Sequence, residues 1–126
     1  MLTEASLVAF VGVADLERAH AFYGDALGLR LVESNGFANI YDAGGTQLRV
    51  TLVHEPAGAG YTVLGWVVSD IAGAIATLEG RGVRFERFPE VVQDEGGVWT
   101  APDGSQIAWF RDPDGNLLSL TTRAGE

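Results

Sequence analysis

Arg111-Asp112-Pro113-Asp114-Gly115-Asn116 separates two apolar runs, Gln106–Phe110 and Leu117–Thr121. Asp-Pro-Asp-Gly is a turn sequence, because proline presets φ at the first central position and glycine accepts positive φ. The flanks are rich in aliphatic and aromatic residues and predict two strands of a hairpin. Side chains alternate along a strand, so two sets of residues each share a face: Ile107, Trp109 and Arg111 before the turn, and Leu117, Ser119 and Thr121 after it.

Length and composition limit what this chain can be. Its 126 residues suit one domain with a real core, and it has no run of about 20 apolar residues that would span a membrane. It has no cysteine, which excludes disulfides, thiolate nucleophiles and Cys-based metal sites. Seventeen acidic against eight basic residues give a net charge of −9, so a nucleic-acid partner is not expected. The start of the sequence lacks a secretion signal, and a cytoplasmic location is expected.

The pattern of elements occurs twice along the chain. Residues 7–13 form an apolar run, Asp15 stands at a helix N-cap position, and helical spacing continues to Gly28. The same order restarts after the Pro- and Gly-containing stretch, with Asp70 as the second N-cap. We therefore divide the single domain into module one (6–54), a linker (55–60) and module two (61–122). The expected strands are 7–13, 29–33, 37–41, 47–53, 62–68, 83–86, 98–101, 106–111 and 117–122, with an irregular acidic stretch at 87–97.

The two halves also align residue by residue, which indicates a duplicated module. Val8 aligns with Val63, Asp15 with Asp70, and the turn at Gly45 with that at Gly115. With the segments V-A-D-L-E-R-A-H-A-F-Y-G-D-A-L-G-L and F-R-D-P-D-G-N-L-L-S-L, the chain resembles the vicinal oxygen chelate superfamily. That superfamily includes glyoxalase I, extradiol dioxygenases, fosfomycin-resistance enzymes and bleomycin-binding resistance proteins.

The resemblance implies an α+β fold in which two tandem βαβββ modules form a curled mixed sheet around a cavity, commonly in a homodimer. It also implies four metal-ligand positions, one on the first and one on the last strand of each module. These positions hold Val8, Arg49, Val63 and Ser119. Valine has no donor atom, arginine is a permanent cation and one hydroxyl is a poor ligand, so no metal and no other cofactor is expected.

Strand parity predicts which side chains would line the cavity. That face is expected to hold Val8, Phe10, Gly12, Phe37, Asn39, Tyr41, Arg49, Thr51, Val53, Val63, Gly65, Val67, Ile107, Trp109, Arg111, Leu117, Ser119 and Thr121. The predicted ligand-binding residues are Phe10, Phe37, Asn39, Tyr41, Arg49, Thr51, Trp99, Ile107, Trp109, Arg111 and Ser119. Alternatively, these side chains fill a closed core, with the tryptophans as fillers and Arg49 in a salt bridge. Trp66 has the opposite parity and is assigned to the core.

The sequence assigns no catalytic residue. His20 and His54, the two histidines, are expected at the surface, and no Ser-His-Asp arrangement follows from spacing. Acidic residues at 86, 90, 94 and 95 resemble in character the acidic and aromatic groove of bleomycin-binding relatives, although taken alone they are better explained by a solvated flexible loop. The prediction is a cytoplasmic homodimer that binds a small, partly aromatic or cationic organic molecule or antibiotic without the family metal. The alternative is a lyase, isomerase or dioxygenase of the same superfamily that acts on a small metabolite.

Overall fold

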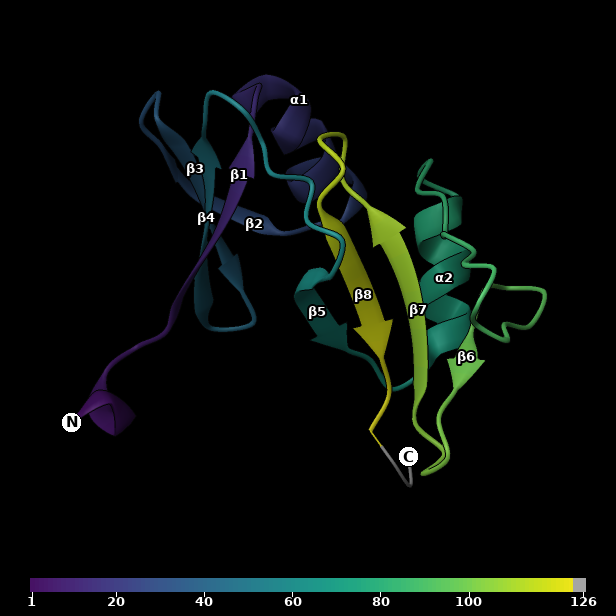
Figure 1. The fold of residues 1–126 in the computed structure, drawn as a ribbon. Helices are drawn as coiled ribbons and strands as arrows, with labels where there is room; N and C mark the ends of the chain where they lie inside the picture. Colours follow the sequence, from purple (N-terminus) through teal and green to yellow (C-terminus); the bar gives the residue numbers. More distant parts are fainter. Residues whose placement is uncertain (124–126) are drawn as a thin grey trace. The chain divides into compact units, whose positions relative to one another are not determined.

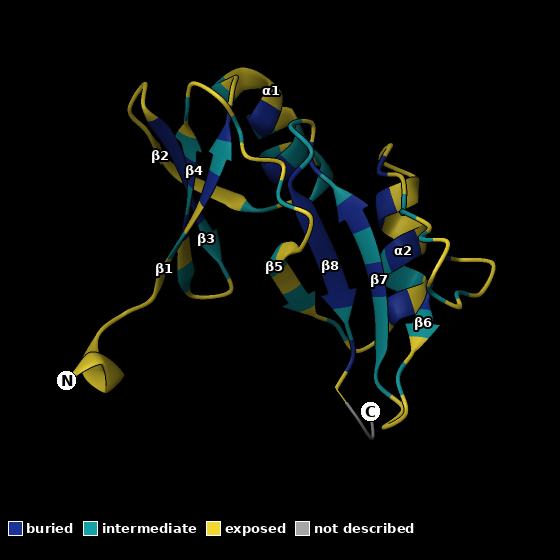
Figure 2. Cartoon of the chain, in the orientation of Figure 1, coloured by how far each residue is buried: buried dark blue, intermediate teal, exposed yellow. Residues whose placement is uncertain are grey.

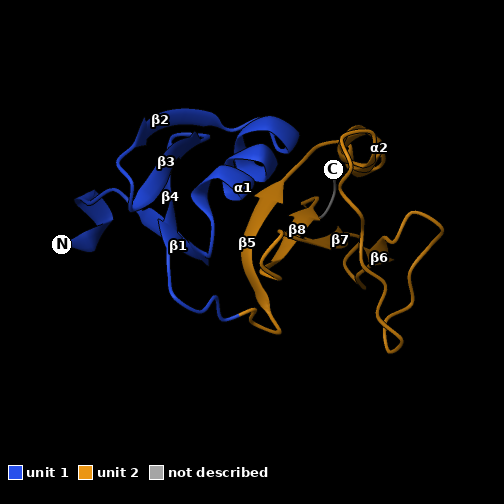
Figure 3. Ribbon diagram, turned by 90° about the horizontal axis from the view of Figure 1, so that it is seen from above, with its two compact units in different colours: residues 1–57 blue, residues 58–126 orange. Residues whose placement is uncertain are grey.

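The computed structural model describes residues 1–123 and divides the chain into two compact units, residues 1–57 and 58–126 (Figure 3). The division falls within the stretch 55–60, where proline and glycines interrupt both neighbouring patterns. Each unit contains one four-stranded mixed sheet and one main helical segment. The predicted α+β architecture of two tandem βαβββ modules is therefore confirmed.

The elements follow the same order in both units (Figure 1). A short 3-10 turn, η1 (Leu2–Glu4), precedes the first unit. Unit 1 then contains β1 (Val8–Val13), α1 (Leu16–His20), the π-helical segment η2 (Ala21–Ala26), β2 (Arg30–Ser34), β3 (Ala38–Ala43) and β4 (Thr46–Leu52). Unit 2 contains β5 (Thr62–Val67), α2 (Ile71–Glu79), β6 (Trp99–Thr100), β7 (Gln106–Arg111) and β8 (Leu117–Thr121).

The two sheets have equivalent topologies. The strand order is β1-β4-β3-β2 in unit 1 and β5-β8-β7-β6 in unit 2. In each sheet the first strand of the unit pairs in parallel with the last, and the other pairs are antiparallel. The helix supplies the crossover that this parallel pair requires, since antiparallel neighbours need only a short turn.

Both helices begin where the sequence predicts. The Asp15 side chain accepts a hydrogen bond from the backbone N–H of Arg18 at 3.0 Å, and Asp70 accepts one from Gly73 at 3.0 Å. The first helix differs from the expected continuous α-helix, because it changes to π-helical geometry after His20. A Cβ at Gly24 would overlap the His20 ring, so this turn leaves room for the imidazole.

Each core lies between one face of a sheet and its helical segment (Figure 2). In unit 1 the buried residues include Val13, Leu48 and Val50, with Tyr23 from η2. In unit 2 the fully buried Phe110 and Leu118 lie on the sheet face that α2 covers, and Trp66 stacks on Phe110 at a centroid distance of 6.4 Å. The assignment of Trp66 to the core side is thus confirmed. Within residues 1–123, no helix has the length and apolar character needed to cross a membrane.

The edge of the second sheet is shorter than the sequence predicts. The expected strand 83–86 makes a single bridge, between Phe85 and Phe110, and β6 has only two residues. Side chains, rather than a backbone ladder, hold the intervening segment, as the hydrogen bonds of Gln93 below show.

Candidate ligand-binding face

The face of the unit 2 sheet opposite α2 carries a cluster of aromatic side chains. Trp109 pairs with Ser119 across β7 and β8, and Ile107 pairs with Thr121, which places these residues on one face. Trp99 joins the same face because it is paired with Ile107. The parity predicted around the Asp-Pro-Asp-Gly turn is therefore confirmed. We call the surface formed by Phe88, Trp99 and Trp109 the aromatic face.

Trp109 is the centre of the aromatic face. The Phe88 ring meets it edge-on, with centroids 5.5 Å apart and an interplanar angle of 80°. The Trp99 ring lies 6.4 Å away at an angle of 32°. All three side chains are half-buried, so each packs against its neighbours and keeps part of its surface open. Aromatic rings at such distances attract one another through their quadrupoles and can stack a further flat ring.

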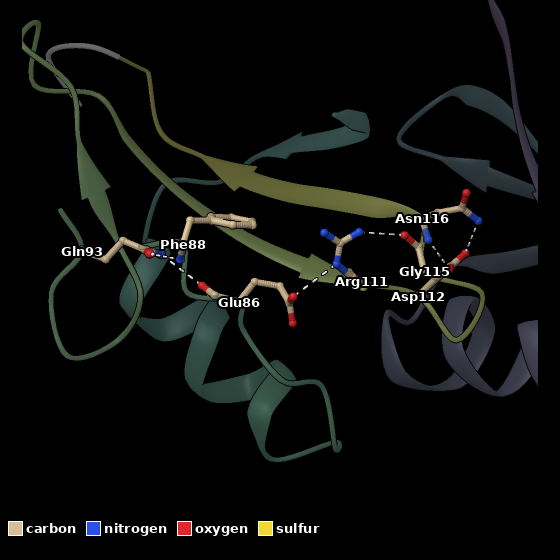
Figure 4. Close-up of polar contacts among 7 residues, drawn as sticks. All are labelled: Glu86, Phe88, Gln93, Arg111, Asp112, Gly115 and Asn116. Atoms are coloured by element: carbon tan, nitrogen blue, oxygen red, sulfur yellow. Dashed lines mark hydrogen bonds and ion pairs between the residues drawn. The ribbon is translucent and has the colours of Figure 1, made fainter. Parts of the chain in front are cut away.

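An ion pair borders the aromatic face. Arg111 Nε donates to Glu86 Oε1 at 3.2 Å, and a terminal nitrogen of Arg111 donates to the Gly115 carbonyl at 2.9 Å. Figure 4 shows the guanidinium held between Glu86 and the turn. Both side chains are about one-third exposed, at 34% for Arg111 and 35% for Glu86, so the pair contributes about 1 kcal/mol or less to stability. Its main effect is to fix Arg111, which the sequence predicts as a ligand-binding residue, in one orientation.

Gln93 holds the loop that supplies Phe88. Its Oε1 accepts from the Phe88 N–H at 2.9 Å and its Nε2 donates to the Glu86 carbonyl at 3.0 Å (Figure 4). The same Nε2 also donates to the Gly97 carbonyl at 2.7 Å. Asp94 Oδ1 accepts from the N–H groups of Gly96 and Val98, each at 2.9 Å. The stretch is irregular, as predicted, but polar side chains tie it to the sheet edge.

Phe88 and Gln93 are site residues that the sequence analysis missed. The signal for Phe88 was its parity: continuing the extended segment 83–86 by two residues places Phe88 on the same face as Glu86. Gln93 gave no signal, because a glutamine in a polar loop has many possible partners, and only the folded loop shows which ones it bonds.

Gly65 and Ser119 fit together on the face that holds Trp109. These two residues are paired across β5 and β8, and a Cβ at Gly65 would stand 2.8 Å from Ser119 Oγ. Ser119 is 8% exposed. The hydroxyl therefore occupies the space that a side chain at residue 65 would need.

Unit 1 also has a sheet face away from its helix, and we call it the open face. Arg49 pairs with Phe10 of β1 and with Ile40 of β3, and Thr51 pairs with Gly12 and Ala38. Phe10 is 64% exposed and Val8 is 37% exposed, whereas Arg49 and Thr51 are half-buried. The predicted common face of Val8, Phe10, Arg49 and Thr51 is confirmed.

The predicted face of β3 is wrong. Tyr41 pairs with Leu48 and Asn39 with Val50, so both side chains lie on the helix side. There the Tyr41 hydroxyl contacts His20 Nδ1 at 2.8 Å and the Asn39 amide donates to the Leu16 carbonyl at 2.9 Å. Phe37 lies just before β3 and is 77% exposed. The register assigns Ala38 and Ile40, not Asn39 and Tyr41, to the open face.

The four positions that the resemblance assigns to a metal do not fit one. Val8 and Val63 have no donor atom, Arg49 brings a positive charge, and the Ser119 hydroxyl is used to fill space over Gly65. In the part of the chain from residue 1 to 123, no three His, Asp or Glu side chains are grouped so that they could hold a metal ion. The four side chains at the family positions therefore cannot hold a metal ion that would take part in a reaction there.

Comparison with known proteins agrees with the fold described above. A family model described as the Glyoxalase/Bleomycin resistance protein/Dioxygenase superfamily matches residues 6–120. A search of curated proteins found no match. Similar solved structures include a member of that superfamily from Sphaerobacter thermophilus, with 28% identity, a TM-score of 0.74 and coverage of 98% of this chain and 100% of that one.

Two further solved structures share the fold at lower identity. The lactoylglutathione lyase from Agrobacterium tumefaciens has 20% identity and a TM-score of 0.72, with coverage of 94% of this chain and 93% of that one. A glyoxalase/bleomycin resistance protein/dioxygenase from Alicyclobacillus acidocaldarius has 19% identity and a TM-score of 0.72, covering 94% and 91%.

Proposed function

The chain belongs to the glyoxalase/bleomycin resistance protein/dioxygenase superfamily, and we propose that it binds a small, partly aromatic organic molecule on the aromatic face of unit 2, without the family metal. The observation that carries this proposal is the half-buried cluster of Phe88, Trp99 and Trp109 on the sheet face that α2 leaves uncovered. Binding sites for small molecules are commonly built in this way, from aromatic walls and a few oriented polar groups.

The charges favour a neutral or cationic ligand on the aromatic face. Arg111 is engaged by Glu86 and Gly115, so its charge is already balanced at the edge of the cluster. The exposed carboxylates of Glu90, Asp94 and Glu95 lie on the loop that carries Phe88, within a chain of net charge −9. The negative electrostatic potential of these carboxylates and of the whole chain attracts cations to the protein. A ring with delocalised positive charge also stacks well on tryptophan.

The test uses tryptophan fluorescence with proflavine, a planar aromatic cation, and 2-naphthol, a planar neutral compound. Replacing Trp66 by phenylalanine first removes the tryptophan on the core side. We expect binding in this background to quench Trp99 and Trp109. Loss of one stacking ring, in Trp99→Ala or Trp109→Ala, weakens binding about 2- to 12-fold.

Matched controls separate stacking from folding. Trp66→Phe itself leaves the dissociation constant unchanged, and the far-UV circular dichroism of both alanine variants matches that of the parent. The double variant Trp99→Ala/Trp109→Ala has no tryptophan in this background, so its affinity is measured by isothermal titration calorimetry. Unchanged affinity in the folded double variant would contradict the proposal. Catalytic turnover of a glyoxalase or dioxygenase substrate would instead support a metal-dependent enzyme, if a metal chelator abolished that activity.

We also propose that the protein is a cytoplasmic homodimer. The support is the superfamily membership. Light scattering is expected to give twice the chain mass of 13.4 kDa, and a monomer at micromolar concentration would contradict it.

A further inference from the structure

Arg49 stands in the middle of the open face of unit 1, among apolar neighbours. Its strand partners on that face are Phe10 on one side and Ile40 on the other. Phe10 is 64% exposed, and Val8, two residues before it in β1, is 37% exposed. Arg49 therefore has apolar partners on both adjoining strands, and the other charged side chains of this face are those of Arg30 and Glu33 on β2 and Asp42 on β3.

The Arg49 side chain makes no hydrogen bond or ion pair within residues 1–123, although it is half-buried. The other half-buried arginine of this part of the chain, Arg111, is paired with Glu86. Asp42 is the carboxylate of β3 on the same face as Arg49, but it is engaged elsewhere. It accepts from Arg30 at 3.0 Å and from the Gly45 N–H at 2.8 Å.

A partly buried guanidinium without a partner interacts strongly with an incoming anion. Its surroundings screen charge less than water does, and its planar fork matches the two oxygens of a carboxylate. The apolar neighbours add contact area for the remainder of such a molecule. A strongly hydrated inorganic anion could pair with the Arg49 guanidinium, but it would make no contact with Phe10 and Val8, which would stay exposed to water.

We propose that the open face of unit 1 is a binding site for an organic carboxylate with an aromatic or branched apolar body. Arg49 holds the carboxylate through two parallel N–H···O hydrogen bonds, and the body packs on Phe10 and Val8. The superfamily resemblance assigns residue 49 to a metal-ligand position, and this chain has a fixed cation there. The inference concerns unit 1 alone and does not depend on the aromatic face.

The experiment compares 1-naphthoate with 1-naphthamide, which has the same shape and no charge, by isothermal titration calorimetry. Acetate and inorganic phosphate test the anion without the apolar body. In the unmodified protein we expect naphthoate to bind at least about 10-fold more tightly than naphthamide, as for a charged hydrogen-bonded pair. Acetate and phosphate are expected to bind too weakly to saturate at millimolar concentration.

Arg49→Gln is expected to abolish the preference for naphthoate over naphthamide, and Arg49→Lys to retain only part of it, because lysine lacks the bidentate fork. In the Trp99→Ala/Trp109→Ala background, which removes the aromatic face, Phe10→Ala should weaken both ligands equally. Arg84→Gln, which removes an exposed arginine from unit 2, is the matched charge control and should change nothing. Circular dichroism and thermal melts confirm that each variant is folded.

Several results would overturn the inference. They are equal affinity for acid and amide in the unmodified protein, an unchanged preference in folded Arg49→Gln, or saturable acetate or phosphate binding as tight as that of naphthoate. Trp109→Ala distinguishes the two sites: loss of the acid preference in that variant would place the carboxylate at the aromatic face and refute the site on unit 1. Failure of proflavine to bind refutes only the proposed function.

Discussion

The Nδ1 atom of His20 lies 2.8 Å from the hydroxyl oxygen of Tyr41, and the two rings are stacked with centroids 5.9 Å apart. This contact joins the end of α1 to β3. The Asn39 amide, which donates to the Leu16 carbonyl at 2.9 Å, lies beside the same hydroxyl, and Ser34 Oγ donates to Asn39 Oδ1 at 2.7 Å. A line of polar side chains thus connects the first helix of unit 1 to two strands of its sheet.

This arrangement predicts a loss of stability in alkali. Burial raises the pKa of the Tyr41 hydroxyl, with a smaller opposing effect of Asn39 and a further increase from the charge of Asp25. Below about pH 10 tyrosine is protonated in both states, and the native hydrogen bond is fully available. Above that pH the unfolded chain releases the proton first, so the free energy of unfolding falls as the pH rises.

Urea denaturation of Tyr41→Phe between pH 8 and 11 measures this effect. At pH 8 the variant should be about 1 kcal/mol less stable, because His20 loses a buried partner. Its stability should then decline less steeply above pH 10 than that of the parent. Tyr61→Phe, at a tyrosine that is 71% exposed, is the control and should follow the parent curve. Identical alkaline slopes for Tyr41→Phe and the parent would show that Tyr41 is not responsible.

The Asp-Pro-Asp-Gly turn predicts a large cost for losing Asp112. This residue is 5% exposed, and its carboxylate accepts from the N–H groups of Asp114 and Asn116, each at 2.9 Å, and from Asn116 Nδ2 at 2.8 Å. Asp112→Ala leaves these donors without an acceptor, and each unsatisfied buried group costs about 1–3 kcal/mol. We therefore expect a loss of more than about 2 kcal/mol in the free energy of unfolding.

Asp103→Ala is the matched control, because Asp103 makes a similar turn at the surface. Its Oδ1 accepts from the Ser105 N–H at 2.9 Å and the Ser105 hydroxyl at 2.6 Å, and the residue is exposed. Water replaces these bonds, so the loss should stay below about 1 kcal/mol. Equal costs at the two positions, measured by urea denaturation, would contradict the role assigned to burial.

The sequence was sufficient for most of the fold and for half of the candidate surfaces. The Asp-Pro-Asp-Gly turn gives the correct parity of β7 and β8, and both aspartate N-caps are where the pattern predicts. These features depend on interactions between residues close in sequence, which propensity and spacing describe well. They were reliable where strand parity was counted directly from a recognised turn, as for β7 and β8.

The error on β3 shows what parity alone lacks. Gly44 and Gly45 have φ values of 61° and 94°, which form a two-residue hairpin turn that pairs Ala43 with Thr46. Counting outward from this pair places Arg49 opposite Ile40, and Tyr41 with Asn39 on the other face. The turn is recognisable in the sequence, but the predicted face of strand 37–41 was not counted from it, so Tyr41 was wrongly assigned to the cavity. The contact of Phe88 with Trp109 depends on the loop fold, and its one sign in the sequence is the parity of segment 83–86 continued to Phe88.

The hydrogen bonds of Asp42 predict that the free energy of unfolding decreases at acid pH. The Gly45 N–H and then the Arg30 side chain lower the pKa of the Asp42 carboxyl. Its contribution is therefore present above about pH 4 and is lost as the pH falls through the native pKa. Asp42→Asn should reduce stability at pH 7 and flatten the dependence on pH below 4. Glu33→Gln removes one charge from the neighbouring strand as the control, and a similar flattening in that variant would count against Asp42.

Gly65 and Ser119 predict a coupling that can be measured by a double-mutant cycle. In Gly65→Ala the new Cβ would stand 2.8 Å from Ser119 Oγ and 3.7 Å from the Ser119 carbonyl oxygen. Apart from Gly65 and its two chain neighbours, no other heavy atom of residues 1–123 lies within 4 Å of it. The overlap displaces the Ser119 hydroxyl, the end of a side chain that is 8% exposed, and we expect this displacement to cost about 0.5–1.5 kcal/mol. Ser119→Ala removes the overlapping oxygen, so Gly65→Ala should cost less than half as much in that background. Additive losses of unfolding free energy would show that the two side chains do not share this space.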